Sequence, residues 1–132
     1  MAAKVNRRRA NQILVSMLVT FSLLRIYLHL FPSTNLDVAG FNIHHLFTGL
    51  ILITIGAIPL IVFEGDSRLL DFSAILFGGG LSLALDEWVY LIVTDGSDTS
   101  YLAPESLWGA AIMIGLTSAY ILILVRRQNR QE

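Results

Sequence analysis

The sequence predicts an all-α polytopic membrane protein, an up-down-up-down bundle of four transmembrane helices that forms one domain over residues 1–132. Three observations predict this fold class. First, 55% of the residues are apolar and only 14% are charged, whereas soluble domains carry roughly 25% charged residues. Second, four segments approach the ~20 apolar residues that cross a bilayer as a helix. Third, the connections between them are short, so we expect consecutive helices to be antiparallel neighbours.

The predicted spans cover residues 11–31, 41–63, 70–93 and 106–125. The first ends before Pro32, and its apolar run is too long for a signal peptide, so we expect it to be retained. The second and the fourth contain no charged residue, and the third is interrupted by Asp86 and Glu87. We assign helices rather than strands because membrane barrels need at least about 8 strands.

Basic residues predict the orientation in the membrane. Eight of the nine Lys and Arg residues flank one predicted membrane face: Lys4, Arg7, Arg8, Arg9, Arg68, Arg126, Arg127 and Arg130. The connections 33–40 and 94–104 contain no Lys or Arg. The positive-inside rule then places both termini in the cytoplasm and the chain in the cytoplasmic membrane. Because these residues serve as topology anchors, we expect the lipid bilayer as a partner and no nucleic acid.

Small residues inside the spans predict how the helices pack. Gly49 and Gly56 lie in the second span, and a run of three glycines, 78–80, lies in the third. In lipid, small residues allow two helix backbones to approach closely. We therefore interpret these glycines as packing positions; local unwinding of the third span at its glycine run is the alternative.

Ionisable residues inside the spans gather at one depth. The following lie within roughly 10 Å of the predicted outer face, at ~1.5 Å per residue: Arg25, His29, His44, His45, Asp86 and Glu87. An ionisable residue deep in a span costs ~2.5–3.5 kcal/mol on insertion scales and generally has a partner or a function. The sequence therefore predicts a polar site in the outer half of the bundle.

Several side-chain arrangements fit this cluster. Arg25 either forms an ion pair with Asp86 or Glu87 or extends toward the outer headgroups. Neighbouring residues on a helix point about 100° apart, so we expect only one of His44 and His45 to face the bundle centre. The same reasoning applies to Asp86 and Glu87.

Imidazole and carboxylate groups together suggest metal-dependent chemistry. Both suit a divalent zinc, iron or manganese ion, which activates a bound water or dioxygen. The candidate metal ligands are His44, His45, Asp86, Glu87 and His29. Asp86, Glu87 and His45 are the candidate catalytic residues. The chain has no cysteine, which excludes a zinc–thiolate site. His29 as an interfacial residue, and a purely structural hydrogen-bonded cluster, are the alternatives.

Three segments carry a resemblance to a known group: FNIHHLFTG, GGGLSLALDE and DGSDTSYLAPESLWG. They resemble a widespread family of uncharacterised prokaryotic integral membrane proteins, which has an HxHHxxxG-like start to one span and a glycine-rich run ending in Asp-Glu. This chain has Asn42 where that pattern begins with histidine. The resemblance implies no activity, but it groups the following residues: His44, His45, Gly49, Gly79, Asp86, Glu87, Tyr101 and Ser106.

Three classes of function fit the sequence. The first is a membrane-embedded, metal-dependent enzyme whose lipid-like substrate enters between the second and third spans. The second is an ion- or proton-coupled transport or sensing protein. The apolar inner half of every span argues against a full transport path, and a single four-helix unit is small for alternating access, so this function would need a homo-oligomer. The third is a structural accessory subunit. We interpret Trp88, Trp108, Tyr27 and Tyr101 as aromatic residues at the membrane interface.

Overall fold

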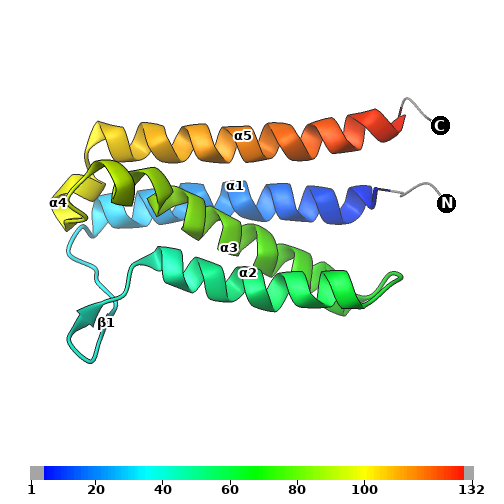
Figure 1. The fold of residues 1–132 in the computed structure, drawn as a ribbon, viewed down its shortest axis with the longest axis horizontal. Helices are drawn as coiled ribbons and strands as arrows, with labels where there is room; N and C mark the ends of the chain where they lie inside the picture. Colours follow the sequence, from blue (N-terminus) through cyan, green and yellow to red (C-terminus); the bar gives the residue numbers. More distant parts are fainter. Residues whose placement is uncertain (1–4, 130–132) are drawn as a thin grey trace.

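The computed structural model describes residues 5–129 (Figure 1). Lys4 and Arg130, two of the basic residues that predict orientation, lie outside this range. The described chain forms α1 (Arg7–Leu30), β1 (Asp37–Val38), β2 (Phe41–Asn42), α2 (His45–Val62), α3 (Arg68–Val93), α4 (Asp98–Tyr101) and α5 (Pro104–Asn129). Helices α1, α2, α3 and α5 are each long and apolar enough to cross a membrane. The structure thus confirms the all-α class and the four long apolar helices.

The long helices alternate in direction (Figure 1). The start of α1, the end of α5 and the turn between α2 and α3 lie at one end of the molecule, which we call the terminal end. The β1–β2 hairpin and α4 lie at the opposite end, which we call the hairpin end. Of the described basic residues, Arg7, Arg8, Arg9, Arg68, Arg126 and Arg127 belong to helix segments at the terminal end.

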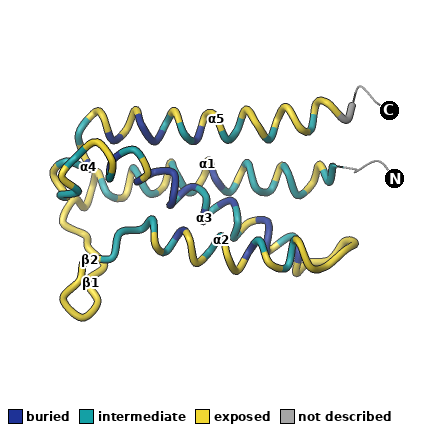
Figure 2. The backbone as a smooth tube through the Cα atoms, viewed as in Figure 1, coloured by how far each residue is buried: buried dark blue, intermediate teal, exposed yellow. Residues whose placement is uncertain are grey.

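Helix α3 is the centre of the fold. It packs against α1, α2 and α5, whereas α1 and α2 share no extensive interface within residues 5–129. Half of the most apolar stretch of α3 is buried, against 17% or less in the other three long helices, and Figure 2 shows this concentration of buried residues. The prediction that consecutive helices pack as neighbours is therefore wrong for α1 and α2, because α3 lies between them.

The connection between α1 and α2 holds a hairpin that the sequence prediction missed. Strands β1 and β2 pair antiparallel, and the two residues between them, Ala39 and Gly40, have φ of 52° and 83°. Two-residue hairpin turns of this kind require positive φ at both positions. Helix α2 consequently begins at His45 rather than at the predicted Phe41.

Glycines bring α2 and α3 into backbone contact. A Cβ atom on Gly80 would lie 2.7 Å from the carbonyl oxygen of Gly49 and the amide nitrogen of Ile53. A Cβ atom on Gly56 would lie 2.6 Å from the amide nitrogen of Phe77. Because α3 is one continuous helix from Arg68 to Val93, the structure confirms the packing interpretation and not the unwinding alternative.

We expect Gly80→Ala to lower the free energy of unfolding by about 1–3 kcal/mol, because the added methyl group overpacks the α2–α3 contact. Thermal unfolding in detergent, followed by circular dichroism, measures the loss. Gly115→Ala is the matched control, since nothing lies within 4 Å of a Cβ at Gly115. Equal stability of the two variants would contradict the backbone contact.

Candidate functional site

Both histidines at the start of α2 reach carboxylates of α3. His44 Nδ1 lies 3.0 Å from Glu87 Oε1, and His45 Nε2 lies 2.9 Å from Asp86 Oδ2. The expectation that only one of them faces the bundle centre is wrong. His44 precedes the helix and has an extended backbone, with φ −58° and ψ 142°, so the 100° rule for adjacent helical residues does not apply to this pair.

Adjacent Asp86 and Glu87 are also both buried, contrary to expectation. Asp86 is 0% exposed and Glu87 is 3% exposed. The central position of α3 explains this, because neighbouring elements cover more than one of its faces. Asp86 contacts Arg25 of α1, while Glu87 contacts the start of α2.

Glu87 caps helix α2 from a neighbouring helix. The first turn of α2 has no acidic residue, and the side chain of His44 makes no capping hydrogen bond. The amide of Leu46 instead donates to Glu87 Oε2 at 2.8 Å. A carboxylate at a helix N-terminus satisfies a free amide and interacts favourably with the helix dipole, so Glu87 stabilises the helix that carries the histidines.

Arg25 joins α1 to three other elements. Its Nε donates to Asp86 Oδ1 at 2.6 Å. Its terminal nitrogens donate to the backbone oxygens of Tyr101 and Ser106 at 3.2 Å, and to Ser106 Oγ at 3.1 Å. The guanidinium carbon also lies 4.2 Å from the centre of the Tyr101 ring. Of the two alternatives for Arg25, the structure shows the ion pair with Asp86.

Tyr101 is a member of the site that the composition of the spans did not predict. It is 7% exposed, and its hydroxyl donates to Asp86 Oδ2. Burial and the negative charge of Asp86 raise the pKa of Tyr101, so the hydroxyl stays protonated and donates. Interpreting Tyr101 as an interface aromatic is therefore wrong, whereas Trp88, Trp108 and Tyr27 are 52%, 67% and 47% exposed.

Ser106 also belongs to the site and is fully buried at the start of α5 beside Arg25. The signal that points to both Tyr101 and Ser106 is the resemblance described above, whose pattern includes them. Among the residues grouped by that pattern, the structure places His44, His45, Asp86, Glu87, Tyr101 and Ser106 in one connected network.

The predicted metal ligands come together only in part. His29 is exposed and lines a separate, mostly apolar pocket between α1 and α5, so it does not join the cluster. Within residues 5–129, no group of three or more His, Asp or Glu side chains is arranged to hold a metal ion. Arg25 and Tyr101 contact the oxygens of Asp86 instead. A bound divalent metal stays a prediction.

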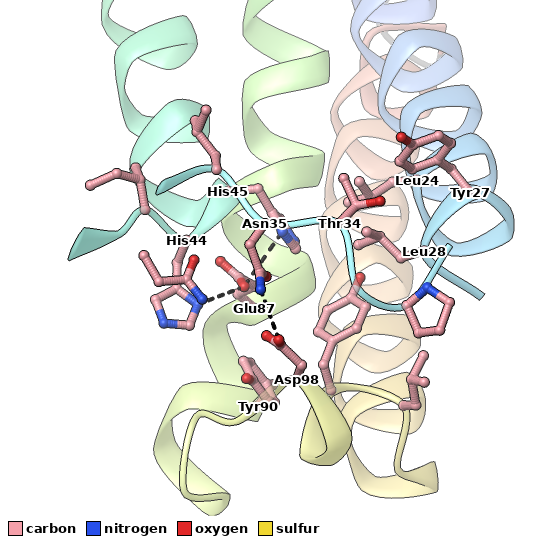
Figure 3. A pocket seen from close by; sticks show the side chains of 16 residues that line it. Leu24, Tyr27, Leu28, Thr34, Asn35, His44, His45, Glu87, Tyr90 and Asp98 are labelled. Carbon is pink, nitrogen blue, oxygen red and sulfur yellow. Dashed lines mark hydrogen bonds and ion pairs between the residues drawn. The ribbon is translucent and has the colours of Figure 1, made fainter. Parts of the chain in front are cut away.

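A pocket of about 200 Å³ opens beside the cluster at the hairpin end (Figure 3). His44, His45 and Glu87 form part of one wall, and Leu24 and Leu28 of α1 lie on the opposite side. The connection between α1 and α2 covers it: Asn35 Nδ2 in that connection donates to Asp98 Oδ2 of α4 at 2.9 Å. The remaining lining residues include Tyr27, Pro32, Thr34, Leu36, Asn42, Ile43, Tyr90, Tyr101 and Leu102.

The predicted access route between the second and third spans is wrong. Helices α2 and α3 are in backbone contact at Gly49 and Gly80. Helices α1 and α2 instead lie apart along the described chain, and residues from both of these helices line the pocket. The side of the pocket that helix packing does not close is therefore the gap between α1 and α2.

The His44–Glu87 pair is suited to acid–base chemistry. A carboxylate bound to one ring nitrogen of an imidazole fixes its tautomer and orientation, which leaves the other nitrogen to exchange a proton. In this site Glu87 is at Nδ1, and Nε2 of His44 has no hydrogen-bond partner among the residues that the structure describes. His45 differs, because both of its ring nitrogens face carboxylates, at 2.9 Å and 3.4 Å.

Comparison of the chain with protein-family models, with curated proteins and with solved structures finds no match. The resemblance to the uncharacterised prokaryotic family thus stays a prediction.

We expect Arg25→Met to lower the free energy of unfolding by about 3–5 kcal/mol, because it leaves Asp86 buried without its cation. The double variant Arg25→Met/Asp86→Asn should recover part of this loss. Denaturant titration in detergent measures both. Arg68→Gln, at an exposed position, is the control and should change stability by less than about 0.5 kcal/mol. If Arg25→Met changed stability as little as this control, the ion pair would not contribute to the stability of the fold.

Proposed function

We propose that this chain is a multi-pass protein of the cytoplasmic membrane that binds a lipid-like molecule in the pocket at the hairpin end and performs acid–base chemistry on it. His44 exchanges the proton, Glu87 orients His44, and Arg25 with Tyr101 holds Asp86 in place. The observation that carries this proposal is the His44–Glu87 pair, 3.0 Å apart in the wall of the pocket.

The distribution of charge supports an outward-facing pocket. The terminal end carries six of the described basic residues, and the two connections at the hairpin end contain no Lys or Arg. By the positive-inside rule the terminal end is cytoplasmic. The pocket then lies at the level of the outer leaflet, where an amphiphilic molecule reaches it from the lipid.

The composition of the pocket supports a lipid-like substrate. One side is polar and carries the paired imidazoles, while Leu24, Tyr27 and Leu28 of α1 form an apolar side. Tyr27 is 47% exposed and Leu36 is 56% exposed, so the apolar side continues onto the surface of the bundle. An amphiphile can therefore place its polar group at the histidines while its chain stays in lipid.

A divalent metal at the same cluster is the second candidate. The observation that favours it is the convergence of two imidazole nitrogens, from His44 and His45, on Glu87 Oε1 at 3.0 Å and 3.4 Å. Zinc would need ligand distances of about 2.0–2.2 Å from nitrogen and oxygen atoms, so these side chains would shift on binding zinc, iron or manganese.

We expect the wild-type protein to convert one class of lipid chemically when it is incubated in maltoside detergent with a total bacterial lipid extract. His44→Gln should slow that change by about 100-fold or more, the usual contribution of a general acid or base. Mass spectrometry of the lipids over time measures both rates. His29→Gln, which alters an exposed histidine outside the cluster, is the matched control and should leave the rate unchanged.

No change in any lipid class, or equal rates for the two histidine variants, would contradict the acid–base proposal. Elemental analysis of the same preparations separates the second candidate. Near-stoichiometric metal in the wild type that is lost in Glu87→Gln would assign the chemistry to the metal.

The orientation has its own test, because the chain contains no cysteine. We expect Val38→Cys in the hairpin to react with a membrane-impermeant maleimide added to intact cells. Glu64→Cys, in the turn between α2 and α3, should react only after the cells are opened. Gel shift of the labelled protein measures both, and the reverse pattern would place the pocket in the cytoplasmic leaflet.

A further inference from the structure

The charge of the pocket lining restricts the headgroup that fits it. Two carboxylates line the pocket, Glu87 and Asp98, and no Lys or Arg does so among the described residues. Arg25 lies nearby but belongs to the adjacent pocket, and its guanidinium is engaged with Asp86 and Ser106. An anionic headgroup would therefore meet two carboxylates and no Lys or Arg in the described lining.

One carboxylate of the lining has an oxygen that can attract a cation through its charge. Asp98 accepts from Asn35 through Oδ2, and its Oδ1 has no partner within residues 5–129. Asp98 is exposed at the start of α4, so this oxygen is open to a ligand. The two connections at the hairpin end also lack Lys and Arg, so neither connection supplies a Lys or Arg side chain that would pair with Asp98.

Aromatic rings complete the lining. Tyr27, Tyr90 and Tyr101 all line the pocket, and Tyr90 and Tyr101 meet edge to face with ring centres 5.4 Å apart. Aromatic rings next to carboxylates are a recurring way to bind ammonium groups. Arg25 already lies against the Tyr101 ring, so one face of this ring is occupied by a cation of the chain itself.

The size of the pocket limits how much of a ligand it encloses. Its volume of about 200 Å³ is below the roughly 300–1,000 Å³ of pockets that enclose a whole drug-sized ligand. It therefore has room for a headgroup, while the chain of the ligand must lie outside, along α1 in the gap toward α2.

We propose that the pocket selects amphiphiles with a positively charged ammonium headgroup, which Asp98 and Glu87 bind through charge and the tyrosines bind through their rings. This inference rests on the proposed binding of a lipid-like molecule and names its chemical class. His44 then lies in the same lining as the headgroup, beside Glu87.

The test uses three probes that share a ten-carbon chain and differ in charge: decyltrimethylammonium, decanol and decanoate. Equilibrium dialysis of the full-length protein in maltoside detergent measures binding. We expect saturable binding of decyltrimethylammonium at one site per chain, at least about tenfold tighter than that of decanoate. Asp98→Asn keeps an acceptor for Asn35. It should weaken the binding of decyltrimethylammonium by about tenfold, which corresponds to about 1.4 kcal/mol.

Two control variants make the result decisive. Asp37→Asn removes an exposed acidic residue of the hairpin that does not line the pocket and should leave binding unchanged. Leu28→Trp fills the apolar side and should abolish binding of every probe. Equal loss in Asp37→Asn and Asp98→Asn would overturn the inference, because it would show attraction to surface charge in general.

The remaining outcomes separate this inference from the proposed function. Saturable binding that Leu28→Trp abolishes, with no preference for the cation, would overturn the ammonium selectivity and leave the lipid-like ligand standing. If no probe showed binding that Leu28→Trp abolishes, both the ammonium selectivity and the lipid-like ligand would be overturned.

Discussion

The ion pair between Arg25 and Asp86 is the contact on which the site depends. Asp86 is completely buried, and a lone carboxylate in such surroundings is strongly disfavoured. Arg25 compensates that charge and uses its other donors to hold the backbone at Tyr101 and Ser106. One side chain of α1 thus fixes where α4 ends and α5 begins relative to α3, and the remaining site residues are positioned around it.

The rest of the site follows from the central position of α3. Backbone contact at Gly49 and Gly80 brings the start of α2 close to α3, so that short imidazole side chains reach Asp86 and Glu87. The same contact closes the side of the pocket between α2 and α3, whereas α1 and α2 share no extensive interface. The contacts between histidines and carboxylates therefore depend on the close packing at the glycines.

Much of the fold could be predicted from the sequence, because span length and apolar content are local properties that the bilayer dictates. The depth of the ionisable residues was predictable for a similar reason, since helical rise converts sequence position into depth. The orientation of side chains was not. That both His44 and His45 reach α3 depends on the hairpin that delays α2, and the site role of Tyr101 depends on a four-residue helix in a loop. Neither leaves a periodic signal.

The Glu87 carboxylate has two structural roles at once. It caps the start of α2 by accepting a hydrogen bond from the amide of Leu46, and it lines the pocket beside His44. A proton or a ligand that takes up the charge of Glu87 must therefore weaken the start of α2, and by thermodynamic reciprocity any loosening of that first turn must alter what the carboxylate can hold. The charge of Glu87 and the integrity of the first turn of α2 are therefore coupled through one side chain.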